Sequence, residues 1–276
     1  MSLVDLHLHS TFSDGWYTPA QLVQAAGKAG LSVLALTDHD SVNGVEEAVR
    51  AARGLNKPLT VVTGIELGTQ QEHSNIHILG YRLDINNLTL LTAVNELRQK
   101  REQRLQQILE LLQRLNIPVR IERKNFPNQA LGRPHVAKAM VSQGYVRTIQ
   151  EAFDRYLGQG RPVYVPQPRL TPPEALALIH QAGGLAFMAH PEEIGSRELV
   201  FRLMESLPWD GLEVYHPSAL AAGTTDYWRS FALKQHLLIS GGSDFHGNAD
   251  RYPAHLGEFI VESQQVNQLW QGQPLQ

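Results

Sequence analysis

The stretch Leu3-Val4-Asp5-Leu6-His7-Leu8-His9 alternates apolar and polar residues near the start of the chain. This alternation predicts a short β-strand, because successive side chains of a strand point to opposite faces. Asp5, His7 and His9 therefore share one face of the strand. Two imidazoles spaced two residues apart on one face can bind the same metal ion.

Strand and helix signals continue to alternate after this stretch. Thr18-Pro19 is typical of a helix start, with threonine as the N-cap and proline at the first helical position. Apolar runs predict strands, and helices between successive strands indicate a parallel α/β sheet or barrel. The predicted strands cover residues 3–9, 31–37, 59–66 and 75–81, with helices at 18–30 and 42–52.

The alternation stops in the middle of the chain. Residues 88–115 have the apolar spacing of one long helix, and shorter helices are predicted for 134–143 and 148–156. We expect residues 100–165 to form an inserted basic, helical subdomain. The main domain would then comprise residues 1–99 and 166–276.

The alternation resumes at Thr171-Pro172-Pro173-Glu174, which combines a capping box with a proline-started helix. Three more strands are predicted at residues 185–190, 211–215 and 237–241, and residues 258–261 are a candidate edge strand. Seven strands followed by helices favour the α/β class, as a (β/α)7 TIM-like barrel with a small helical insertion.

The composition narrows the class of protein. The chain has 276 residues, 42% of them hydrophobic, which allows a sizeable core and excludes disordered and fibrous classes. It has no cysteine, which excludes disulfides, thiolate zinc sites, iron–sulfur clusters and a cysteine nucleophile. No apolar run approaches the roughly 18 residues that span a bilayer, and residues 1–5 carry no signal-peptide pattern. We therefore expect a cytoplasmic protein with no membrane partner.

Charge is unevenly distributed along a chain whose net charge is −3. Residues 98–147 hold eleven Lys and Arg against three Glu, so the remainder of the chain is acidic. Two interpretations remain open. The basic segment is either a long helix with solvated arginines or a surface that binds a polyanion.

Polar residues gather where the predicted strands end. In a parallel barrel, functional side chains come from the carboxyl ends of the strands, so we expect these residues to meet. Six of the seven strands contain or end in a histidine group, and the third ends in glutamate. One such histidine is weak evidence, but the repetition predicts a metal centre. The nine candidate ligands are His7, His9, Asp14, His39, Glu66, His77, His190, Asp244 and His246.

The ligand types limit the metal and the substrate. Imidazole and carboxylate groups suit Zn, Mn or Fe better than Mg or Ca. Nine ligands exceed the needs of one ion and suit two or three divalent ions. Such a centre would carry net positive charge and favour an anion, for which phosphate is the natural candidate. Clustered metal ions also activate water and stabilise the entering and leaving oxygens of an in-line displacement.

The motifs at these strand ends are Asp5-Leu6-His7-Leu8-His9-Ser10, Thr37-Asp38-His39-Asp40, Gly64-Ile65-Glu66, Ala189-His190-Pro191 and Ser243-Asp244-Phe245-His246. Together they resemble the polymerase and histidinol phosphatase (PHP) family, over essentially the whole chain. The resemblance implies a distorted (β/α)7 barrel with a trinuclear metal centre.

The resemblance also implies how the ligands divide among three ions. One ion would bind His7, His9, Glu66 and Asp244, a second would share Glu66 and add His77 and His190, and a third would take Asp14, His39 and His246. All nine positions hold competent ligands. Asp38 is expected to support catalysis by orienting a histidine ring.

The segment Leu131-Gly132-Arg133-Pro134-His135-Val136-Ala137 is similar to one in a single-domain branch of the family. That branch comprises nucleoside 3′,5′-bisphosphate 3′-phosphatases and 5′-to-3′ exoribonucleases. The resemblance implies that Arg133 and His135 bind the substrate phosphate, as suits a guanidinium fork. The alternative is a helix start with exposed side chains. His216 would bind phosphate or protonate a leaving group, or else only pack at its strand end.

These inferences predict a metal-dependent phosphoesterase that removes a phosphate from a nucleotide, in first place the 3′-phosphate of a nucleoside 3′,5′-bisphosphate. Water activated by two to three divalent ions (Mn, Zn or Fe) would attack phosphorus, with inorganic phosphate as a product. The alternatives are a 5′-to-3′ exoribonuclease on short 5′-phosphorylated RNA, a histidinol phosphate phosphatase, an amidohydrolase and a non-catalytic PHP module. No obligate protein partner is expected.

Overall fold

The computed structural model describes residues 2–122, 131–167, 169–249 and 252–266 of the chain. The chain divides into two compact units. The barrel unit comprises Met1–Thr92 and Leu170–Gln276, and the helical unit comprises Ala93–Arg169. Each unit is described by itself below.

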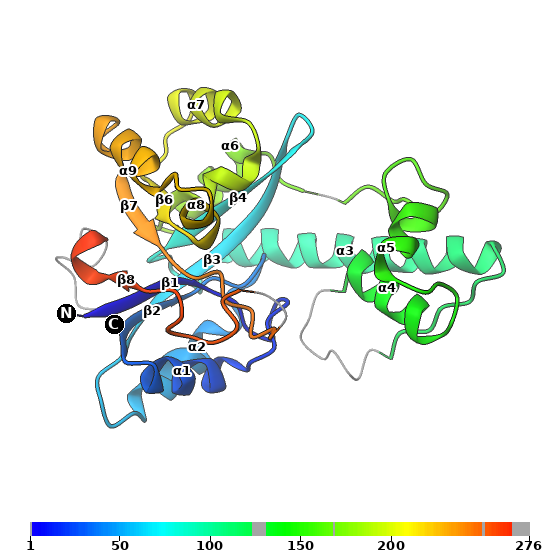
Figure 1. Cartoon of the computed structure of the whole chain (residues 1–276), viewed down its shortest axis with the longest axis horizontal. Coiled ribbons are helices and arrows are strands. Elements are labelled where there is room, and N and C mark those ends of the chain that lie inside the picture. The colour runs from blue at the N-terminus through cyan, green and yellow to red at the C-terminus, as the bar shows by residue number, and fades with distance from the viewer. Residues whose placement is uncertain (1, 123–130, 168, 250–251, 267–276) are drawn as a thin grey trace. The chain divides into compact units, whose positions relative to one another are not determined.

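The barrel unit is built on one sheet of eight strands in the order β7-β6-β5-β4-β3-β2-β1-β8 (Figure 1). Most neighbouring strands run parallel, as expected from the alternating strand and helix signals. The strands are β1 (Leu3–Leu8), β2 (Leu31–Leu36), β3 (Thr60–Gln71), β4 (Ser74–Tyr81), β5 (Leu185–Met188), β6 (Gly211–Tyr215), β7 (Leu238–Gly241) and β8 (Val261–Glu262).

The two ends of this sheet approach each other, so that the sheet is nearly closed into a barrel. Leu8, at the end of β1, forms a parallel bridge with Phe245, which follows β7. The His9 N–H donates to the Phe245 carbonyl oxygen at 3.1 Å. A Cβ atom on Gly242 would lie 2.3 Å from the His7 backbone nitrogen, so this approach requires glycine. The fold is the TIM-like barrel expected from the sequence, with a mixed rather than a fully parallel sheet.

The fourth strand differs from the expected parallel arrangement. Strand β3 does not end at Glu66 but continues to Gln71, and the chain reverses over Glu72 and His73 into β4. Strand β4 is therefore antiparallel to both β3 and β5. The turn lacks the Asn-Gly or Asp-Gly pair that marks a hairpin, and Glu72 takes a φ of 55°. This reversal places the first half of β4 beside the end of β3 that follows Glu66.

The edge strand also differs in extent from the candidate at 258–261. Strand β8 has only two residues, Val261 and Glu262, and pairs antiparallel with the start of β1. This short pairing covers the exposed edge of the first strand.

Helices cover the barrel sheet. In Figure 1, α1 and α2 lie together beside β2 and β3, α6 packs on β3, β4 and β5, and α9 packs on β6 and β7. The predicted caps are present: Thr18 Oγ1 accepts from the Gln21 N–H at 3.2 Å, and Glu174 Oε2 accepts from the Thr171 N–H at 2.7 Å. The helices are α1 (Pro19–Lys28), α2 (Val45–Arg53), α6 (Pro172–Gln181), α7 (Arg197–Ser206), α8 (Pro217–Ala221) and α9 (Thr225–Lys234), with short 3₁₀ turns at Pro191–Ile194 and Ser263–Gln265.

The helical unit has a core of its own. It contains most of α3 (Leu88–Arg114), followed by α4 (Arg133–Ser142), α5 (Ile149–Ala152) and a π-helical turn (Phe153–Leu157). The buried side chains of this core include Leu105, Ile108, Leu112, Val136, Met140, Leu157 and Val163. None of the helices in the described parts of the chain is long and apolar enough to cross a membrane.

The close approach at Gly242 gives a test of barrel closure. We expect Gly242→Ala to lower the free energy of unfolding by about 1–3 kcal/mol, because its methyl group would overlap the His7 backbone. Gly54→Ala is the matched control, since its Cβ would lie 3.4 Å from its nearest neighbour, Ala51 O. Urea unfolding followed by circular dichroism measures both variants. Equal stability of the two variants would contradict the proposed tight contact.

Candidate metal centre

Nine titratable side chains meet at the end of the barrel where the parallel strands finish. His7 lies within β1, and His9 and Asp14 follow it; His39 follows β2. Glu66 lies within β3 and His77 within β4. His190 follows β5, and Asp244 and His246 follow β7. These are the nine residues that the strand-end pattern singled out.

Glu66 lies at the middle of this cluster, and its carboxylate is 1% exposed. Its Oε1 atom is 2.9 Å from His77 Nδ1 and 3.1 Å from His190 Nε2. Its Oε2 atom is 2.9 Å from His39 Nδ1, 3.2 Å from His9 Nε2 and 3.4 Å from His7 Nε2. One buried carboxylate therefore contacts five imidazole rings that come from four strands and the segments after them.

The hairpin between β3 and β4 explains how His77 joins the cluster from the middle of its strand. His77 pairs with Gly68, two residues beyond Glu66 on the antiparallel neighbour. A parallel fourth strand would have needed a histidine at its carboxyl end. The antiparallel direction instead brings the first half of β4 to the carboxyl ends of the other strands.

Asp244 completes the inner group of ligands. Its Oδ1 atom lies 3.0 Å from His9 Nε2 and 3.4 Å from His7 Nε2. Ligand atoms of His7, His9, Glu66 and Asp244 all lie within 4.8 Å of one another, and all four residues are buried. Asp244 has a φ of 52°, a left-handed conformation that aspartate adopts more readily than most residues.

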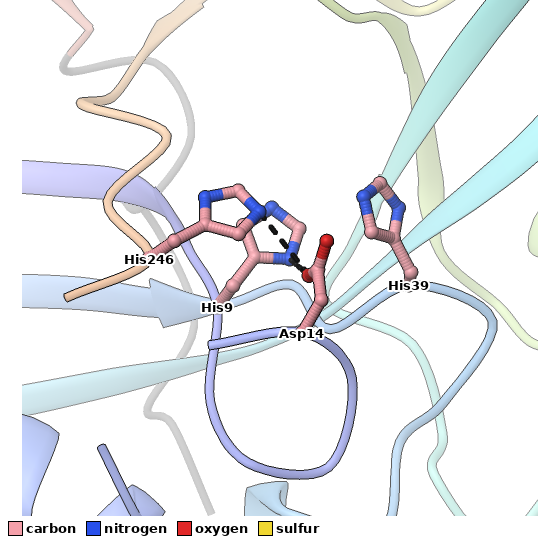
Figure 2. Close-up of side chains that lie close together, drawn as sticks. All are labelled: His9, Asp14, His39 and His246. Atoms are coloured by element: carbon pink, nitrogen blue, oxygen red, sulfur yellow. Dashed lines mark ion pairs between the residues drawn. The ribbon is translucent and has the colours of Figure 1, made fainter. Parts of the chain in front are cut away.

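Asp14 anchors an outer group that reaches solvent. Its Oδ1 atom lies 3.1 Å from His246 Nε2 and 3.8 Å from His9 Nδ1, as the dashed lines in Figure 2 show. His39 faces the same carboxylate from the opposite side (Figure 2). The Asp14 side chain is 46% exposed, so this group is the more accessible edge of the cluster.

Several buried atoms of the cluster have no hydrogen-bond partner among the residues that the structure describes. They are His7 Nε2, His9 Nε2, Glu66 Oε2, His190 Nδ1 and His216 Nε2. Burying such atoms without a partner is costly, and most proteins avoid it. Imidazole nitrogens and carboxylate oxygens that converge in this way are the usual ligands of Zn, Mn and Fe. The residues present therefore fit divalent metal ions.

The charges in the cluster set one another's pKa values. Burial would raise the pKa of Glu66, but the charges of His39, His77 and His7 hold that pKa well below its usual range. Burial would lower the pKa of His9, yet the nearby Asp244 and Glu66 carboxylates raise it to about 10. The carboxylates are thus ionised at neutral pH and available as ligands, while protons compete with metal ions for the imidazoles.

Glu213 supports the cluster. It was not among the residues predicted from the sequence. It is fully buried on β6, its Oε1 lies 2.9 Å from His7 Nδ1, and its Oε2 accepts from the His190 N–H at 2.8 Å. The contact with Nδ1 directs His7 Nε2 toward Glu66 and Asp244. The sequence feature that could have revealed Glu213 is its position as a lone charged residue inside an apolar strand.

Asp5, on β1, supports the cluster through its contacts with Ser243. Its carboxylate accepts from the Ser243 N–H at 2.9 Å and from Ser243 Oγ at 2.5 Å, which ties β1 to the segment that carries Asp244. Burial raises the pKa of Asp5 to about 7 despite these hydrogen bonds. From the sequence, Asp5 was expected to share a strand face with His7 and His9, and no role followed from that position.

Asp38 has a different set of contacts from the expected histidine ring. Its carboxylate accepts from Ser10 N, Ser10 Oγ and Ser13 Oγ, each at 2.6 Å. Among the described residues, Ser13 links Asp38 to an imidazole, because its Oγ also lies 3.4 Å from His9 Nδ1. Asp38 therefore fixes the segment after β1, because hydroxyl and backbone donors from that segment satisfy its buried charge.

His216 lies beside the inner group, at the N-cap of α8. Its Nδ1 accepts from the Ser218 N–H at 3.2 Å, so a neutral ring carries its proton on Nε2. That Nε2 atom is buried and lies 3.8 Å from Asp244 Oδ2. The ring therefore lies beside the Asp244 carboxylate.

Arg133 and His135 lie in the helical unit, at the start of α4. Arg133 Nη1 donates to the Leu157 carbonyl oxygen at 3.1 Å, and its guanidinium lies 5.3 Å from the Tyr164 ring centroid. His135 Nδ1 accepts from the Gly132 N–H at 3.2 Å and so caps the helix. Both side chains therefore have fixed local contacts within their unit.

A nearly closed barrel with a cluster of imidazoles and carboxylates at its strand ends defines a metal-dependent hydrolase. The sequence matches the PHP domain family over residues 5–159. It is 37% identical to a 5′-3′ exoribonuclease of Haemophilus influenzae, over 88% of this chain and 89% of that protein. It is 31% identical to a 3′,5′-nucleoside bisphosphate phosphatase of Chromobacterium violaceum, over 89% of this chain and 88% of that protein.

A solved structure from Bifidobacterium adolescentis, assigned as a metal-dependent phosphoesterase, superimposes with a TM-score of 0.77. It is 29% identical and the match covers 96% of this chain and 94% of that one. The chain belongs to the PHP domain family. It is a metal-dependent phosphoesterase, a hydrolase of phosphoric esters, so the non-catalytic alternative is set aside.

The two groups of ligands predict different effects of two substitutions. We expect Asp14→Ala to lose one bound ion per chain without unfolding the barrel, because the Asp14 side chain is 46% exposed. We expect Glu66→Gln to lose more than one ion and to lower phosphoesterase activity at least ~100-fold, because Glu66 contacts five imidazoles. Elemental analysis and circular dichroism measure both.

The matched control for these variants is Glu72→Gln, at the far end of the same hairpin, where Glu72 pairs only with Arg202 in the described contacts. The control should keep its metal content and activity. Normal metal content in a folded Glu66→Gln variant would remove Glu66 from the centre.

Proposed function

We propose that this phosphoesterase hydrolyses a phosphomonoester of a nucleotide, in first place the 3′-phosphate of a nucleoside 3′,5′-bisphosphate. The observation that carries the proposal is the buried Glu66 carboxylate with five imidazoles around it. This cluster contains more potential metal ligands than one ion needs. A centre with several divalent ions suits phosphate, because it offsets the charge of the phosphoryl oxygens.

The cluster supports two to three ions, with Mn, Zn or Fe as the candidates. The inner ion would use His7, His9, Glu66 and Asp244, a second would use Glu66, His77 and His190, and a third would use Asp14, His39 and His246. When bound, such ions supply positive charge to the phosphoryl oxygens and make water a nucleophile at neutral pH.

The remaining residues position groups and hold protons. His216 Nε2 would donate a hydrogen bond to a phosphate oxygen or a proton to the leaving oxygen, since Nδ1 is occupied by the Ser218 N–H. Glu213 holds the His7 ring, and Asp38 holds the segment that carries Asp14. Arg133 and His135 would bind a phosphate of the substrate.

A 5′-to-3′ exoribonuclease is the second candidate function. It is favoured by the exoribonuclease relative from Haemophilus influenzae and by the basic character of the helical unit. Residues 93–169 hold fourteen Lys and Arg against six Asp and Glu. Such a charge would also attract the backbone of a nucleic acid. Both functions use the same chemistry, the hydrolysis of a phosphate ester beside a second phosphate.

Phosphate or nucleotide release from three substrates tests the proposal. Adenosine 3′,5′-bisphosphate, a short 5′-phosphorylated RNA and histidinol phosphate are each incubated with the protein and Mn²⁺. Rapid release of phosphate from the bisphosphate with slow RNA cleavage is expected. Stepwise release of mononucleotides from RNA at equal or higher efficiency would favour the exoribonuclease. Activity on histidinol phosphate alone would contradict both nucleotide functions.

Arg133 gives a sharper test of nucleotide recognition. We expect Arg133→Ala to raise KM at least ~10-fold for the bisphosphate and less than ~2-fold for p-nitrophenyl phosphate, because only the nucleotide has a second phosphate for the guanidinium. Steady-state kinetics on both substrates measure the difference. Arg155→Ala is the matched control, since Arg155 also stacks on a tyrosine of the helical unit. Equal effects of Arg133→Ala on the two substrates would remove Arg133 from substrate binding.

A further inference from the structure

Trp16, in the segment after β1, exposes a large aromatic ring to solvent. The residue is 60% exposed, whereas Trp209 and Trp228 are 8% and 0% exposed. Among the tryptophans that the structure describes, Trp16 is therefore the one with an accessible ring. An indole usually buries most of its surface, because the ring is large and mainly apolar. The exposed ring of Trp16 leaves an apolar face that a ligand can cover.

Trp16 lies next to the outer ligands of the metal centre. Its N–H donates to the His246 carbonyl oxygen at 2.8 Å, and a Cβ atom on Gly247 would lie 3.4 Å from Trp16 Cβ. Asp14 precedes Trp16 by two residues, so the two Cα atoms are at most about 7 Å apart. Asp14 Oδ1 is itself 3.1 Å from His246 Nε2. The indole is thus attached to the backbone at the accessible edge of the cluster.

The segment that carries Trp16 has a fixed backbone. The N–H groups of Ser13 and Gly15 both donate to the Ser10 carbonyl oxygen at 3.0 Å. A Cβ atom on Gly15 would lie 2.3 Å from the His9 carbonyl oxygen, so this turn is closely packed. The Asp38 carboxylate also accepts from Ser10 and Ser13. A ring on such a backbone loses little freedom when a ligand binds to it.

The two aromatic residues of this segment have different surroundings. Tyr17 packs inward, with its ring centroid 5.7 Å from that of Phe245. Trp16, one residue earlier, is exposed. Within residues 10–17 only Asp14 and Trp16 are exposed, so the segment presents a metal ligand and an indole to solvent together.

An indole beside a metal centre can bind a flat ring that is joined to the phosphate at that centre. Proteins that bind single-stranded nucleotides stack the bases on aromatic side chains, and this contact tolerates every base because each has a π-face. A nucleotide combines such a ring with a phosphate in one molecule. A sugar phosphate has the same charge but no ring that could cover the indole.

We propose that Trp16 stacks on the base of the nucleotide whose phosphate is bound at the metal centre. This inference rests on the proposed function and adds a contact with the base to the contacts with phosphate. Trp16 would favour nucleotides over sugar phosphates of equal charge. Because stacking needs only a flat π-system, it would favour purine and pyrimidine nucleotides alike.

Ligand binding to the full-length, metal-loaded protein tests the contact. The probes are adenosine 5′-monophosphate and ribose 5-phosphate, which lacks the base, each titrated by calorimetry. The unmodified protein should bind the monophosphate more tightly. We expect Trp16→Ala to weaken binding of the monophosphate at least ~5-fold and that of ribose 5-phosphate less than ~2-fold, since only the first has a ring to stack.

Two further substitutions and one control separate stacking from other effects. Trp16→Phe keeps an aromatic face and should weaken binding of the monophosphate by a smaller factor than Trp16→Leu, which keeps only apolar bulk. Tyr227→Ala is the matched control. Tyr227 is 40% exposed on α9 of the same unit, and its ring centroid lies 4.5 Å from the Arg197 guanidinium. This control should bind both probes within ~2-fold of the unmodified protein.

Tryptophan fluorescence gives a readout that a purely structural role would not change. Binding of the monophosphate should quench the fluorescence of the unmodified protein, because the base covers the exposed indole. Ribose 5-phosphate should not quench it. In Trp16→Phe, which still binds, the quenching by the monophosphate should be lost. Undiminished quenching in Trp16→Phe would overturn the contact.

Circular dichroism and elemental analysis show whether each variant is folded and holds its metal ions. If Trp16→Ala fails either check, the comparison of Trp16→Phe with Trp16→Leu takes its place. Unchanged affinity for the monophosphate in a folded, metal-loaded Trp16→Ala variant overturns the proposal. So do equal losses for the two probes, equal affinities of the unmodified protein for both, or equal affinities of the Phe and Leu variants for the monophosphate.

The result is separable from the proposed function. If the protein releases phosphate from the bisphosphate but binding does not depend on Trp16, only the stacking contact fails. If binding of the monophosphate depends on Trp16 while no nucleotide or RNA is hydrolysed, the proposed function fails and the contact stands.

Discussion

The contact on which the barrel unit depends is that of the Glu66 carboxylate with the imidazoles around it. A buried carboxylate is stable only when opposite charges or hydrogen-bond donors surround it, and Glu66 has five rings within 3.4 Å. Those rings come from strands that are distant in sequence. The strand order, the hairpin after β3 and the closure at Gly242 are therefore needed together, because each brings one part of this shell to the same carboxylate.

Residues around the cluster fix the positions of its ligands by hydrogen bonds and ion pairs. Glu213 contacts the His7 ring and accepts from the backbone of His190, and Asp5 binds the segment of Asp244. Asp38 satisfies Ser10 and Ser13 in the segment that carries Asp14. Each of these carboxylates is buried and positions a neighbouring ligand instead of facing solvent. Such supporting contacts fix the orientation of the imidazole rings, and that orientation decides whether several ligands can bind one metal ion at the same time.

The parts of this arrangement that follow from local sequence could be predicted, and those that depend on chain reversal could not. The two-residue period of a strand places His7 and His9 on one face, and histidines or acids that recur after apolar runs predict a common edge. The β3–β4 hairpin was missed because its turn has no marked glycine, so a parallel strand was expected at residues 75–81. Glu213 was missed because burial, not spacing, reveals its role. Asp38 was expected to orient a histidine ring. Its hydrogen-bond donors are Ser10 and Ser13, which the folded loop brings to it, and Ser13 Oγ lies 3.4 Å from His9 Nδ1.

Positive charge near an anionic substrate can come from bound metal ions or from arginine side chains. Outside residues 93–169 the chain holds ten Lys and Arg against twenty-one Asp and Glu, so an anionic substrate would be repelled there without metal ions. The helical unit has the opposite balance, with eleven Arg and three Lys in residues 93–169. Metal ions can activate water, whereas arginines can only bind and orient. Eleven of the eighteen arginines lie within residues 93–169. Under the proposed function, the barrel unit would hydrolyse the ester and the helical unit would bind a phosphate of the substrate. Substitutions in the helical unit should therefore change KM and substrate choice, and those around Glu66 should change metal content and kcat.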